Sequence, residues 1–370
     1  MRIDIDADIT RASTLPGWAY RDPRVFEAAR DRIFARSWQF LGDLTTMVRT
    51  PGAVWPLTLL QGCLDEPIVV TRDMDDRTHV LSNVCTHRGT IVCEHAGTER
   101  HLRCRYHGRR FGLDGRFQHM PEFEDVRGFP TGADDLASIP SGTFGPFLFA
   151  SLRPACELDA LIGPMRSRLG WLPLHEFRFD PARSRDYLVR ANWALYCDNY
   201  LEGFHIPFVH SGLNEVLDYG SYVTELYPLA NLQLGVAKSG SPGADSGAEE
   251  VFDLPPSSPD YGKPIAAYYY WLFPNTMFNF YPWGLSVNVV RPLGPDLTRV
   301  SFLSYVWDEK KLGIGAGAAL DRVEREDESV VEAVQKGVRS RIYDRGRYSP
   351  SREQGVHHFH RLFAEHLGEF

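Results

Sequence analysis

Residues 83–117 read "NVCTHRGTIVCEHAGTERHLRCRYHGRRFGLDGRF" and contain two short pairs of potential metal ligands. Cys85 and His87 form the first pair, and Cys104 and His107 form the second, after a spacer of sixteen residues. Thiolates and imidazoles both bind transition metals, so two of each would fill one tetrahedral zinc site. Structural zinc sites, however, usually pair Cys with Cys and His with His, whereas each pair here contains one of each type.

The mixed pairing favours a cluster with two irons, because one iron takes both thiolates while the other takes both imidazoles. That is the ligand set of a Rieske [2Fe–2S] centre. Gly89 and Gly108 follow the two pairs and would let the backbone turn close to the inorganic sulfides. Strand-like segments such as PIVVTRD and GTFGPFLFA flank the motif. We therefore predict a [2Fe–2S] cluster bound by Cys85, His87, Cys104 and His107, with a structural zinc site as the alternative.

A second candidate metal site lies in residues 192–210, which read "NWALYCDNYLEGFHIPFVH". His205 and His210 are five residues apart, so a regular helix would point them about 140° away from each other. Pro207 lies between them and interrupts the helical hydrogen bonds, and a kink or π-type turn there would bring the two rings together. Two His and one carboxylate on one face of Fe(II) leave positions open for dioxygen and substrate. The alternative is a pair of hydrogen-bonded histidines on a core helix.

The carboxylate is expected from residues 319–338, which read "ALDRVEREDESVVEAVQKGV" and have the spacing of a helix with one buried face. Asp327 continues the apolar stripe that the leucine and the valines form on this helix. A charged residue on such a stripe requires a partner, and a metal ion is a suitable one. Glu324 borders the stripe and is the alternative ligand. We place Glu326 and Glu328 on the solvated face of the helix.

With both motifs in view, the chain resembles the oxygenase (α) component of the Rieske non-haem iron oxygenases. The family pattern of Cys-x-His-Arg-Gly, a spacer and Cys-x-Tyr-His-Gly is matched at Cys85, His87, Arg88, Gly89, Cys104, Tyr106, His107 and Gly108. The chain departs from the pattern at Arg109, where the family typically has Trp. We expect this change at the surface where the cluster meets its electron donor or a neighbouring subunit. The family's two iron-binding His and its late Asp correspond to His205, His210 and Asp327.

The resemblance implies an α+β fold with two domains. We expect an antiparallel β Rieske [2Fe–2S] domain over residues 41–153. A helix-grip (START-like) catalytic domain is expected over residues 154–370, with a curved antiparallel sheet and long helices around a cavity, and residues 1–40 are expected to pack on it. The family assembles as homotrimers, in which the cluster of one subunit lies beside the iron of the next. Glu202 occupies the position of the acidic residue that bridges the two centres.

A glutamate at position 202 is similar to the choline, carnitine and glycine betaine branch of the family, since the naphthalene branch has Asp there. The resemblance thus implies a terminal oxygenase component with a [2Fe–2S] cluster and a mononuclear Fe(II). Its expected reaction is the hydroxylation or oxidative N-demethylation of a small quaternary ammonium or N-methyl compound with O2. Two alternatives remain open: an aromatic ring-hydroxylating dioxygenase, and a non-catalytic Rieske electron carrier or ligand sensor. The aromatic side chains of residues 266–290 suit an aromatic substrate or, through cation–π attraction, a cationic one.

Composition and the absence of certain sequence motifs limit the expected binding partners and the expected cellular compartment. The net charge of −8 argues against nucleic acid as a partner. No apolar run is long enough for a membrane-spanning helix, and the N-terminus lacks a secretory signal pattern, so a cytoplasmic protein is expected. The GIGAG segment at 313–317 lacks the rest of a dinucleotide fingerprint, so electrons from NAD(P)H are expected to arrive through a separate flavin or iron–sulfur reductase. We also expect a mobile loop over 238–250, and exposed histidines at 357–360 on a C-terminal amphipathic helix.

Overall fold

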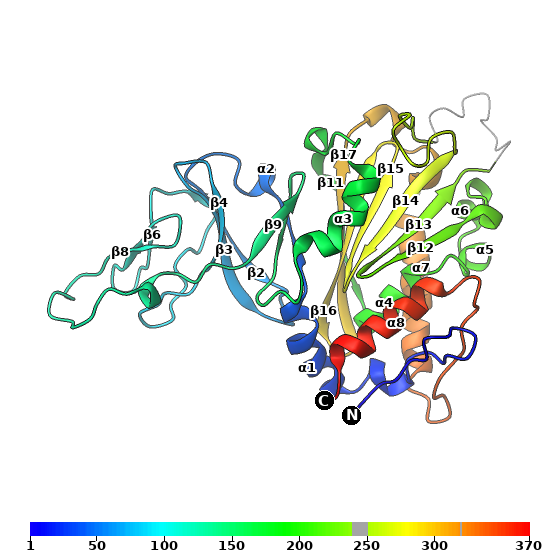
Figure 1. Ribbon diagram of the computed structural model, residues 1–370, viewed down its shortest axis with the longest axis horizontal. Helices are drawn as coiled ribbons and strands as arrows, with labels where there is room; N and C mark the ends of the chain where they lie inside the picture. Colours follow the sequence, from blue (N-terminus) through cyan, green and yellow to red (C-terminus); the bar gives the residue numbers. More distant parts are fainter. Residues whose placement is uncertain (239–250, 319) are drawn as a thin grey trace. The chain divides into compact units, whose positions relative to one another are not determined.

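The structure, a computed structural model, describes three stretches of the chain: residues 1–238, 251–318 and 320–370. The loop predicted over 238–250 therefore lies outside the described residues, except for its first residue. The described residues have an α+β fold, as predicted, with four antiparallel sheets and helices of up to 18 residues (Figure 1).

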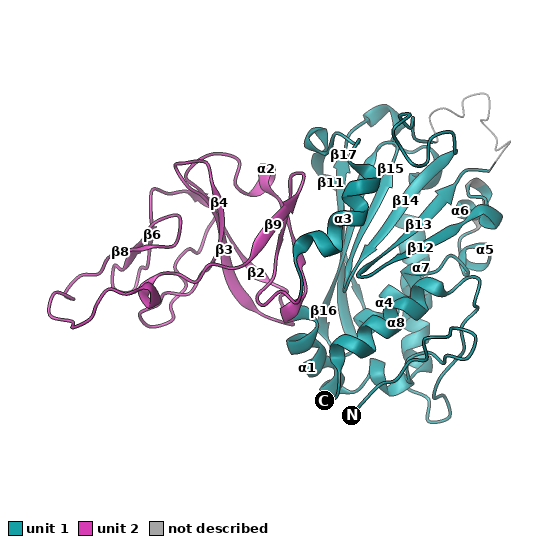
Figure 2. Ribbon diagram, viewed as in Figure 1, with its two compact units in different colours: residues 1–34, 156–370 teal, residues 35–155 magenta. Residues whose placement is uncertain are grey.

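The chain divides into two compact units (Figure 2). Residues 35–155 form the smaller unit (magenta), and residues 1–34 together with 156–370 form the larger unit (teal). The junctions lie a few residues away from the boundaries at 40 and 153 that the sequence suggests. The smaller unit is thus an insertion in the larger one.

The two ends of the insertion are held side by side. The carbonyl of Ala35 accepts a hydrogen bond of 3.0 Å from the amide of Arg153, and the carbonyl of Arg36 accepts one of 2.9 Å from the amide of Ala155. The unit therefore closes on a stem formed by its own first and last residues.

The smaller unit contains three small antiparallel sheets, in the strand orders β1-β10-β9, β4-β3-β2-β5 and β6-β7-β8. Its elements are β1 (Gln39–Asp43), α2 (Leu44–Met47), β2 (Ala53–Leu59), β3 (Glu66–Arg72), β4 (Thr78–Ser82), β5 (Gly97–Thr98), β6 (Leu102–Arg103), β7 (Arg110–Phe111), β8 (Phe117–His119), β9 (Ser141–Phe144) and β10 (Phe147–Ala150). Successive side chains of β3 point to opposite faces. Val69 joins the core that contains Cys85 and Cys104, while Val70 joins a second core that contains Leu148 of β10.

The larger unit is built on a seven-stranded antiparallel sheet with the strand order β11-β17-β16-β15-β14-β13-β12. The strands are β11 (Arg178–Val189), β12 (Val223–Tyr227), β13 (Ala230–Val236), β14 (Ile265–Leu272), β15 (Thr276–Tyr281), β16 (Gly284–Gly294) and β17 (Leu297–Val306). Strands β14 to β16 contain most of the aromatic run of the sequence and are buried along nearly their whole length. Both faces of the sheet must therefore be covered.

The larger unit also contains seven α-helices in the described chain, and some of them cover the two faces of the sheet. The seven helices are α1 (Pro23–Arg32), α3 (Leu158–Leu169), α4 (Trp193–Tyr200), α5 (Ile206–Val209), α6 (Ser211–Val216), α7 (Leu320–Gly337) and α8 (Gln354–Leu367). On one face the Tyr268 hydroxyl donates to Asp260 at 3.2 Å, and Asp260 also pairs with Arg168 of α3 at 2.6 Å. On the opposite face, Trp271 packs edge-on against Phe359 of α8 at 5.3 Å. Within the described chain, no helix has the length and apolar character needed to cross a bilayer.

The histidines at 357–360 lie on a helix, as expected, but they are not exposed. His357 and His360 are buried and His358 is partly buried, because this side of α8 packs against the sheet and the N-terminal segment. Each ring has a polar partner: a backbone carbonyl for His357, the Asn231 side chain for His358 at 2.6 Å, and Asp198 for His360 at 2.7 Å. Burial is tolerated because these hydrogen bonds replace the ones that the rings lose to water.

Candidate active site and metal centres

Two loops of matching geometry carry the predicted cluster ligands. The first begins at Cys85, after β4, and the second begins at Cys104, between β6 and β7. In each loop the Cys amide donates to the carbonyl five residues further on, at 2.8 Å. The amides of Gly89 and Gly108 donate back to the Cys carbonyls at 3.0 and 3.1 Å. Both glycines have a positive φ, 75° and 76°, which costs a residue with a Cβ more than it costs glycine. The same turn is therefore built twice.

The four predicted cluster ligands divide into a buried pair of thiols and a less buried pair of imidazoles. Cys85 and Cys104 are 3% and 2% exposed in one core, and burial raises the pKa of the Cys85 thiol, with the neighbouring Cys104 adding to the rise. His87 and His107 are only partly buried, with ring centroids 4.8 Å apart. Burial, followed by the charge of His107, lowers the pKa of His87 and favours the neutral imidazole that binds a metal. Two inner thiols and two outer imidazoles suit a cluster whose irons differ in their ligands.

Arg109 lies in the interior of the unit, which corrects the expectation of a surface position. Its side chain is 2% exposed and forms an ion pair of 2.7 Å with Asp134. The guanidinium also lies 5.0, 5.4 and 5.7 Å from the ring centroids of Phe117, Phe129 and Phe111. A carboxylate and three aromatic faces thus replace part of the water that a buried cation gives up, while Arg109 Nε has no hydrogen-bond partner in the described structure.

Asp134 connects the two cluster loops. Its backbone carbonyl accepts hydrogen bonds from the Thr86 hydroxyl in the first loop, at 2.7 Å, and from Arg109 at the end of the second, at 3.1 Å. Hydrogen bonding to the Thr131 backbone, and next to Arg109, lowers the pKa of the Asp134 carboxyl, so this group is ionised at neutral pH. The sequence motif did not reveal this residue, because Asp134 lies far beyond the ligands along the chain.

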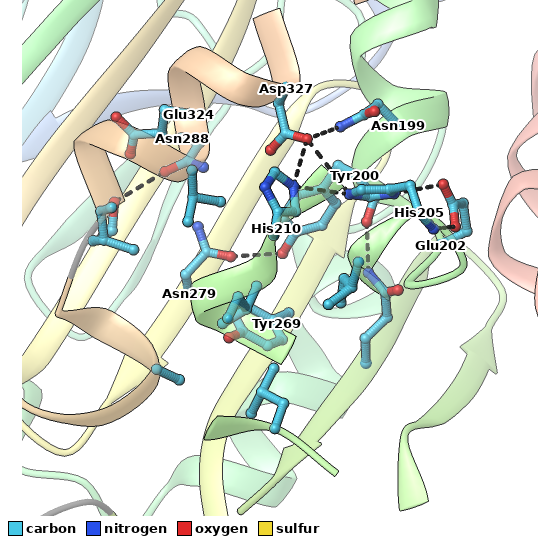
Figure 3. Close-up of a pocket in the computed structure, with 18 of the residues that line it drawn as sticks. Asn199, Tyr200, Glu202, His205, His210, Tyr269, Asn279, Asn288, Glu324 and Asp327 are labelled. Atoms are coloured by element: carbon cyan, nitrogen blue, oxygen red, sulfur yellow. Dashed lines mark hydrogen bonds and ion pairs between the residues drawn. The ribbon is translucent and has the colours of Figure 1, made fainter. Parts of the chain in front are cut away.

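The second predicted site is assembled from two segments of the larger unit (Figure 3). The Nε2 atoms of His205 and His210 are 3.2 Å apart, and the Oδ1 atom of Asp327 lies 3.4 Å from the first and 3.0 Å from the second. Ligands at right angles around a metal about 2.1 Å away lie about 3.0 Å from each other, so one ion would reach all three atoms. Among the described residues, these are the one group of three or more His, Cys, Asp or Glu side chains with this arrangement.

A break in the helix explains how two histidines five residues apart meet. Helix α4 ends at Tyr200, and α5, which contains Pro207 in its first turn, has only four residues. His205 and His210 therefore lie at the two ends of α5, and His210 has a non-helical φ of −113° and ψ of 76°. The kink predicted at the proline is thus a full interruption of the helix on both sides of α5, and not a π-type turn.

Each of these histidines has a carboxylate at its other ring nitrogen. The Oε1 atom of Glu202 lies 2.6 Å from His205 Nδ1, and the Oε2 atom of Glu326 lies 2.7 Å from His210 Nδ1. With Nδ1–H donating to a carboxylate, each Nε2 keeps its lone pair for a metal. The Asn199 side chain donates to Asp327 Oδ1 at 2.6 Å. The donor set and its supporting contacts therefore fit a mononuclear Fe(II).

Three glutamates of α7 differ in their surroundings. The sequence places Glu326 on the solvated face, but the structure places it against His210, because the interrupted helix brings that ring to the side of α7. Glu328 is not fully solvated either, since its Oε1 atom is buried without a hydrogen-bond partner in the described structure. Glu324, the alternative ligand, does not join the three-atom group. A metal-binding His usually donates its other ring N–H to a carboxylate or a carbonyl. That rule would have suggested searching the acidic residues near Asp327 for a partner of His210, and Glu326 is one of them.

Glu202 is held rigidly beside the second site. Its Oε1 atom contacts His205 Nδ1, and its Oε2 atom accepts hydrogen bonds from the backbone amides of Phe204 and His205. The carboxylate therefore also fixes the turn that leads into α5. Glu202 thus contacts the ring of a predicted iron ligand, which is one of the two contacts that the predicted bridge role requires.

A cavity of about 110 Å³ adjoins the three ligand atoms. One wall is the sheet, where side chains on neighbouring strands line up in register: Gln233 with Tyr269, Tyr269 with Asn279, and Asn279 with Ser286. Residues of α4 and α7 also line the cavity, and Glu324 is one of them. The aromatic rings of the lining are Tyr196, Tyr200, Tyr222, Tyr269, Tyr281 and Phe302. Part of the aromatic run in the sequence thus faces the cavity, while the rest is sheet core.

Two family models match most of the chain. Residues 174–369 match the ring hydroxylating alpha subunit (catalytic domain), and residues 54–130 match the Rieske [2Fe-2S] domain. The chain therefore belongs to the Rieske non-haem iron oxygenases, as their oxygenase (α) subunit. It is a terminal oxygenase component, an oxidoreductase that uses O2, with a Rieske [2Fe–2S] cluster and a mononuclear iron as cofactors. An enzyme is thereby favoured over a non-catalytic electron carrier.

Individual relatives place the chain within this family. It is 30% identical to the chloroplastic choline monooxygenase of Arabidopsis thaliana, over 97% of this chain and 84% of the relative. It is 28% identical to the carnitine monooxygenase oxygenase subunit of Escherichia coli (strain K12), over 97% and 95%. These relatives fit the choline and carnitine branch that Glu202 suggests.

Solved structures share the fold. The quaternary ammonium Rieske monooxygenase CntA superposes with a TM-score of 0.79, at 22% identity and with 100% of both chains covered. Naphthalene 1,2-dioxygenase from Rhodococcus sp. superposes with a TM-score of 0.73, at 20% identity, covering 96% of this chain and 94% of the other. Fold alone therefore does not separate the two branches.

Proposed function

We propose that this oxygenase hydroxylates or oxidatively N-demethylates a small quaternary ammonium or N-methyl compound. The composition of the cavity wall carries the proposal. The described residues of that wall supply aromatic rings, neutral amides and carboxylates, and none of them is Lys or Arg. Aromatic faces attract a quaternary ammonium group, which has no hydrogen to donate. The names of the choline and carnitine monooxygenases and of the quaternary ammonium oxygenase CntA point to the same substrate class.

The metal-binding residues have separate proposed roles. The cluster ligands are Cys85, His87, Cys104 and His107, and the iron ligands are His205, His210 and Asp327. When bound, the cluster supplies electrons and the Fe(II) activates O2. Glu202 and Glu326 keep the two iron-binding rings in the tautomer and orientation that ligation needs.

Electrons are proposed to cross between subunits. Glu202 would accept a second hydrogen bond from a cluster-binding His of a neighbouring subunit in a homotrimer, so that electrons pass from one subunit's cluster to the next subunit's iron. They would come from a separate NAD(P)H-dependent reductase with a flavin or an iron–sulfur centre, because no complete dinucleotide fingerprint is present in the sequence. The whole assembly is proposed to be cytoplasmic.

The proposed N-demethylation balances in atoms and electrons. Insertion of one oxygen atom into an N-methyl C–H bond consumes O2, two electrons and two protons and releases one water. The resulting N-hydroxymethyl group then loses its C–N bond, which yields formaldehyde and the demethylated amine. Hydroxylation at a carbon that carries no nitrogen would stop after the first step. The chain's own contribution is to bind and orient the substrate and to limit the entry of bulk water.

An aromatic ring-hydroxylating dioxygenase is the second candidate, favoured by the six rings of the cavity lining. The polar part of the lining argues against it. Gln233, Asn279, Asn288 and Glu324 would face an aromatic hydrocarbon that offers them no hydrogen bonds and no charge.

Oxygen consumption tests the proposal. The iron-loaded oxygenase is combined with a surrogate reductase and NADH, and O2 uptake is recorded with choline, glycine betaine, carnitine and, for comparison, naphthalene. We expect uptake above background with at least one quaternary ammonium compound, accompanied by formaldehyde or a hydroxylated product. Stimulation by naphthalene alone, with a cis-diol as the product, would instead establish the second candidate.

A further inference from the structure

We propose that Glu324 is the counter-charge that recognises the positively charged group of the substrate, and is thus a specificity-determining residue of the cavity. This inference rests on the proposed function and deepens it, because it names the side chain that selects a cation. Glu324 and Asp327 lie on the same helix, α7, and Glu324 is three residues earlier (Figure 3). Three residues correspond to about 4.5 Å of helix rise. A cation beside Glu324 would therefore hold its N-bound carbons close to the metal site.

Glu324 lies between the inner cavity and an outer cleft, because it lines both. It lines the inner cavity next to the iron ligands and also a polar cleft of about 730 Å³. The two spaces share four lining residues: Ser286, Phe302, Leu320 and Glu324. A ligand that occupies the inner cavity and extends toward the cleft would therefore pass directly beside this carboxylate.

The protein itself supplies no partner for Glu324. In the described parts of the chain, this carboxylate makes neither a hydrogen bond nor an ion pair. The arginines of the outer cleft are engaged elsewhere: Arg183 and Arg325 pair with aspartates at 3.3 Å, and Arg185 donates to backbone carbonyls at 2.6 and 2.8 Å. Among these arginines, Arg185 lowers the pKa of Glu324 through its charge, but in the described chain it makes no direct hydrogen bond or ion pair with the carboxylate.

The surroundings of Glu324 favour a cation. Burial raises the pKa of this carboxyl to about 8, and the negative charges of Asp321, Glu328 and Asp327 contribute further. Without a positive charge nearby, this carboxyl is therefore mostly protonated at neutral pH, and a cation placed next to it would lower its pKa and favour the ionised form. Since none of the described residues that line the inner cavity is Lys or Arg, a cationic substrate would add a positive charge that, among the groups at this cavity, only the metal ion otherwise supplies.

Aromatic rings complete the recognition site. Tyr196, Tyr281 and Phe302 line the same cavity as Glu324. Burial raises the pKa of both tyrosine hydroxyls well above their usual value, so both rings are neutral, and Glu324 is near enough to add to the rise when it is ionised. A quaternary ammonium group would thus meet ring faces and one carboxylate. A neutral group of the same shape would gain only the contacts with the rings.

The test compares a cation with its neutral isostere in the iron-loaded holoenzyme. Choline and 3,3-dimethylbutan-1-ol differ only in a quaternary nitrogen against a quaternary carbon, and tetramethylammonium serves as a minimal cation. Binding is measured by anaerobic calorimetric titration of the wild type and of Glu324→Gln. We expect the substitution to weaken the binding of both cations by about tenfold or more, and to change the binding of the alcohol by less than about twofold.

Glu328→Gln is the matched control. It removes the same charge from the same helix, at a residue that does not line the inner cavity, and should change cation affinity by less than about twofold. Equal losses in the two variants would overturn the proposal, because the effect would then be the general charge of α7. Unchanged discrimination between choline and the alcohol in Glu324→Gln would also overturn it.

Iron content and oxygen uptake distinguish a failed role of Glu324 from a failed function of the enzyme. The iron content of Glu324→Gln should equal that of the wild type, and loss of the iron would make Glu324 a ligand instead of a recognition residue. Failure of every quaternary ammonium compound to stimulate O2 uptake by the wild type would remove the proposed function itself. The titrations report on Glu324 alone, so the two failures are distinguishable.

Discussion

Replacing Arg109 with Met removes a buried positive charge and keeps most of the side-chain volume. In the native structure this guanidinium pairs with Asp134 and lies among three phenylalanine rings. The substitution leaves the carboxylate without its main cationic partner. It also releases one of the two side chains through which Asp134 ties the cluster loops together.

The structure sets the expected magnitude of this change. Removing one partner of a buried ion pair costs about 3–5 kcal/mol. Asp134 is 20% exposed and keeps its hydrogen bonds to Thr131, so water can compensate part of the loss. Sulfur–aromatic contacts of the new Met offset part of the lost cation–π attraction. We therefore expect a loss of about 3 kcal/mol, which for a unit of this size corresponds to a midpoint lowered by roughly 10 °C.

The assay follows the visible absorbance of the cluster during heating of the holoenzyme under argon, at one fixed scan rate. Arg116→Met is the control, since Arg116 is 82% exposed and its ion pair with Asp114 is long, at 3.6 Å. Such a pair contributes about 0.5 kcal/mol or less, so its midpoint should fall by no more than roughly 2 °C. If both variants bleached at the same temperature, the interior ion pair would not stabilise the cluster unit and the reasoning would be wrong.

Three other predictions concern the larger unit. Glu326→Ala should weaken iron binding by about 10–100-fold in a chelator competition while the cluster spectrum stays unchanged, because His210 loses the carboxylate that orients it; undiminished affinity would contradict this. Glu202→Gln should retain both metals but stop electron transfer from cluster to iron in single-turnover experiments, and normal turnover would exclude the bridge. Burial lowers the pKa of His358 to about 4, whereas an unfolded His titrates near 6.5. Between these values the unfolded state binds one more proton, so the free energy of unfolding should fall by about 1.4 kcal/mol per pH unit as the pH drops from 6.5 toward 4. His358→Gln should flatten that slope in urea titrations, and an unchanged slope would assign it to other groups.

The parts of the site that the sequence predicted are those that local chemistry determines. The cluster ligands and the glycines that shape their loops lie within a short stretch, so spacing alone was informative. Asp327 was identifiable because a charge interrupts an apolar stripe, and Pro207 explained how two badly spaced histidines meet. For Asp327 and for the two histidines, a conflict between residue type and local pattern marked the predicted position.

The parts that the sequence did not predict depend on segments that meet only in the folded chain. Glu326 lies off the apolar stripe, and nothing local indicates that an interrupted helix from another segment delivers His210 to it. Arg109 looks like a surface residue until Asp134 and the phenylalanines are placed around it. His360 likewise appears exposed until Asp198 is brought beside it. Burial of a polar side chain follows from where its partner arrives, which periodicity does not encode.

Because residues 35–155 interrupt the larger unit, the order of the chain determines which parts of the protein can fold first during synthesis. Tyr20 and Arg32 leave the ribosome early, yet the groups they bind, the His360 ring and the Leu367 carbonyl, belong to the last helix. Folding units generally form in the order in which they emerge. The opening segment must therefore wait unattached, while the inserted unit can already close on its stem and receive iron and sulfide.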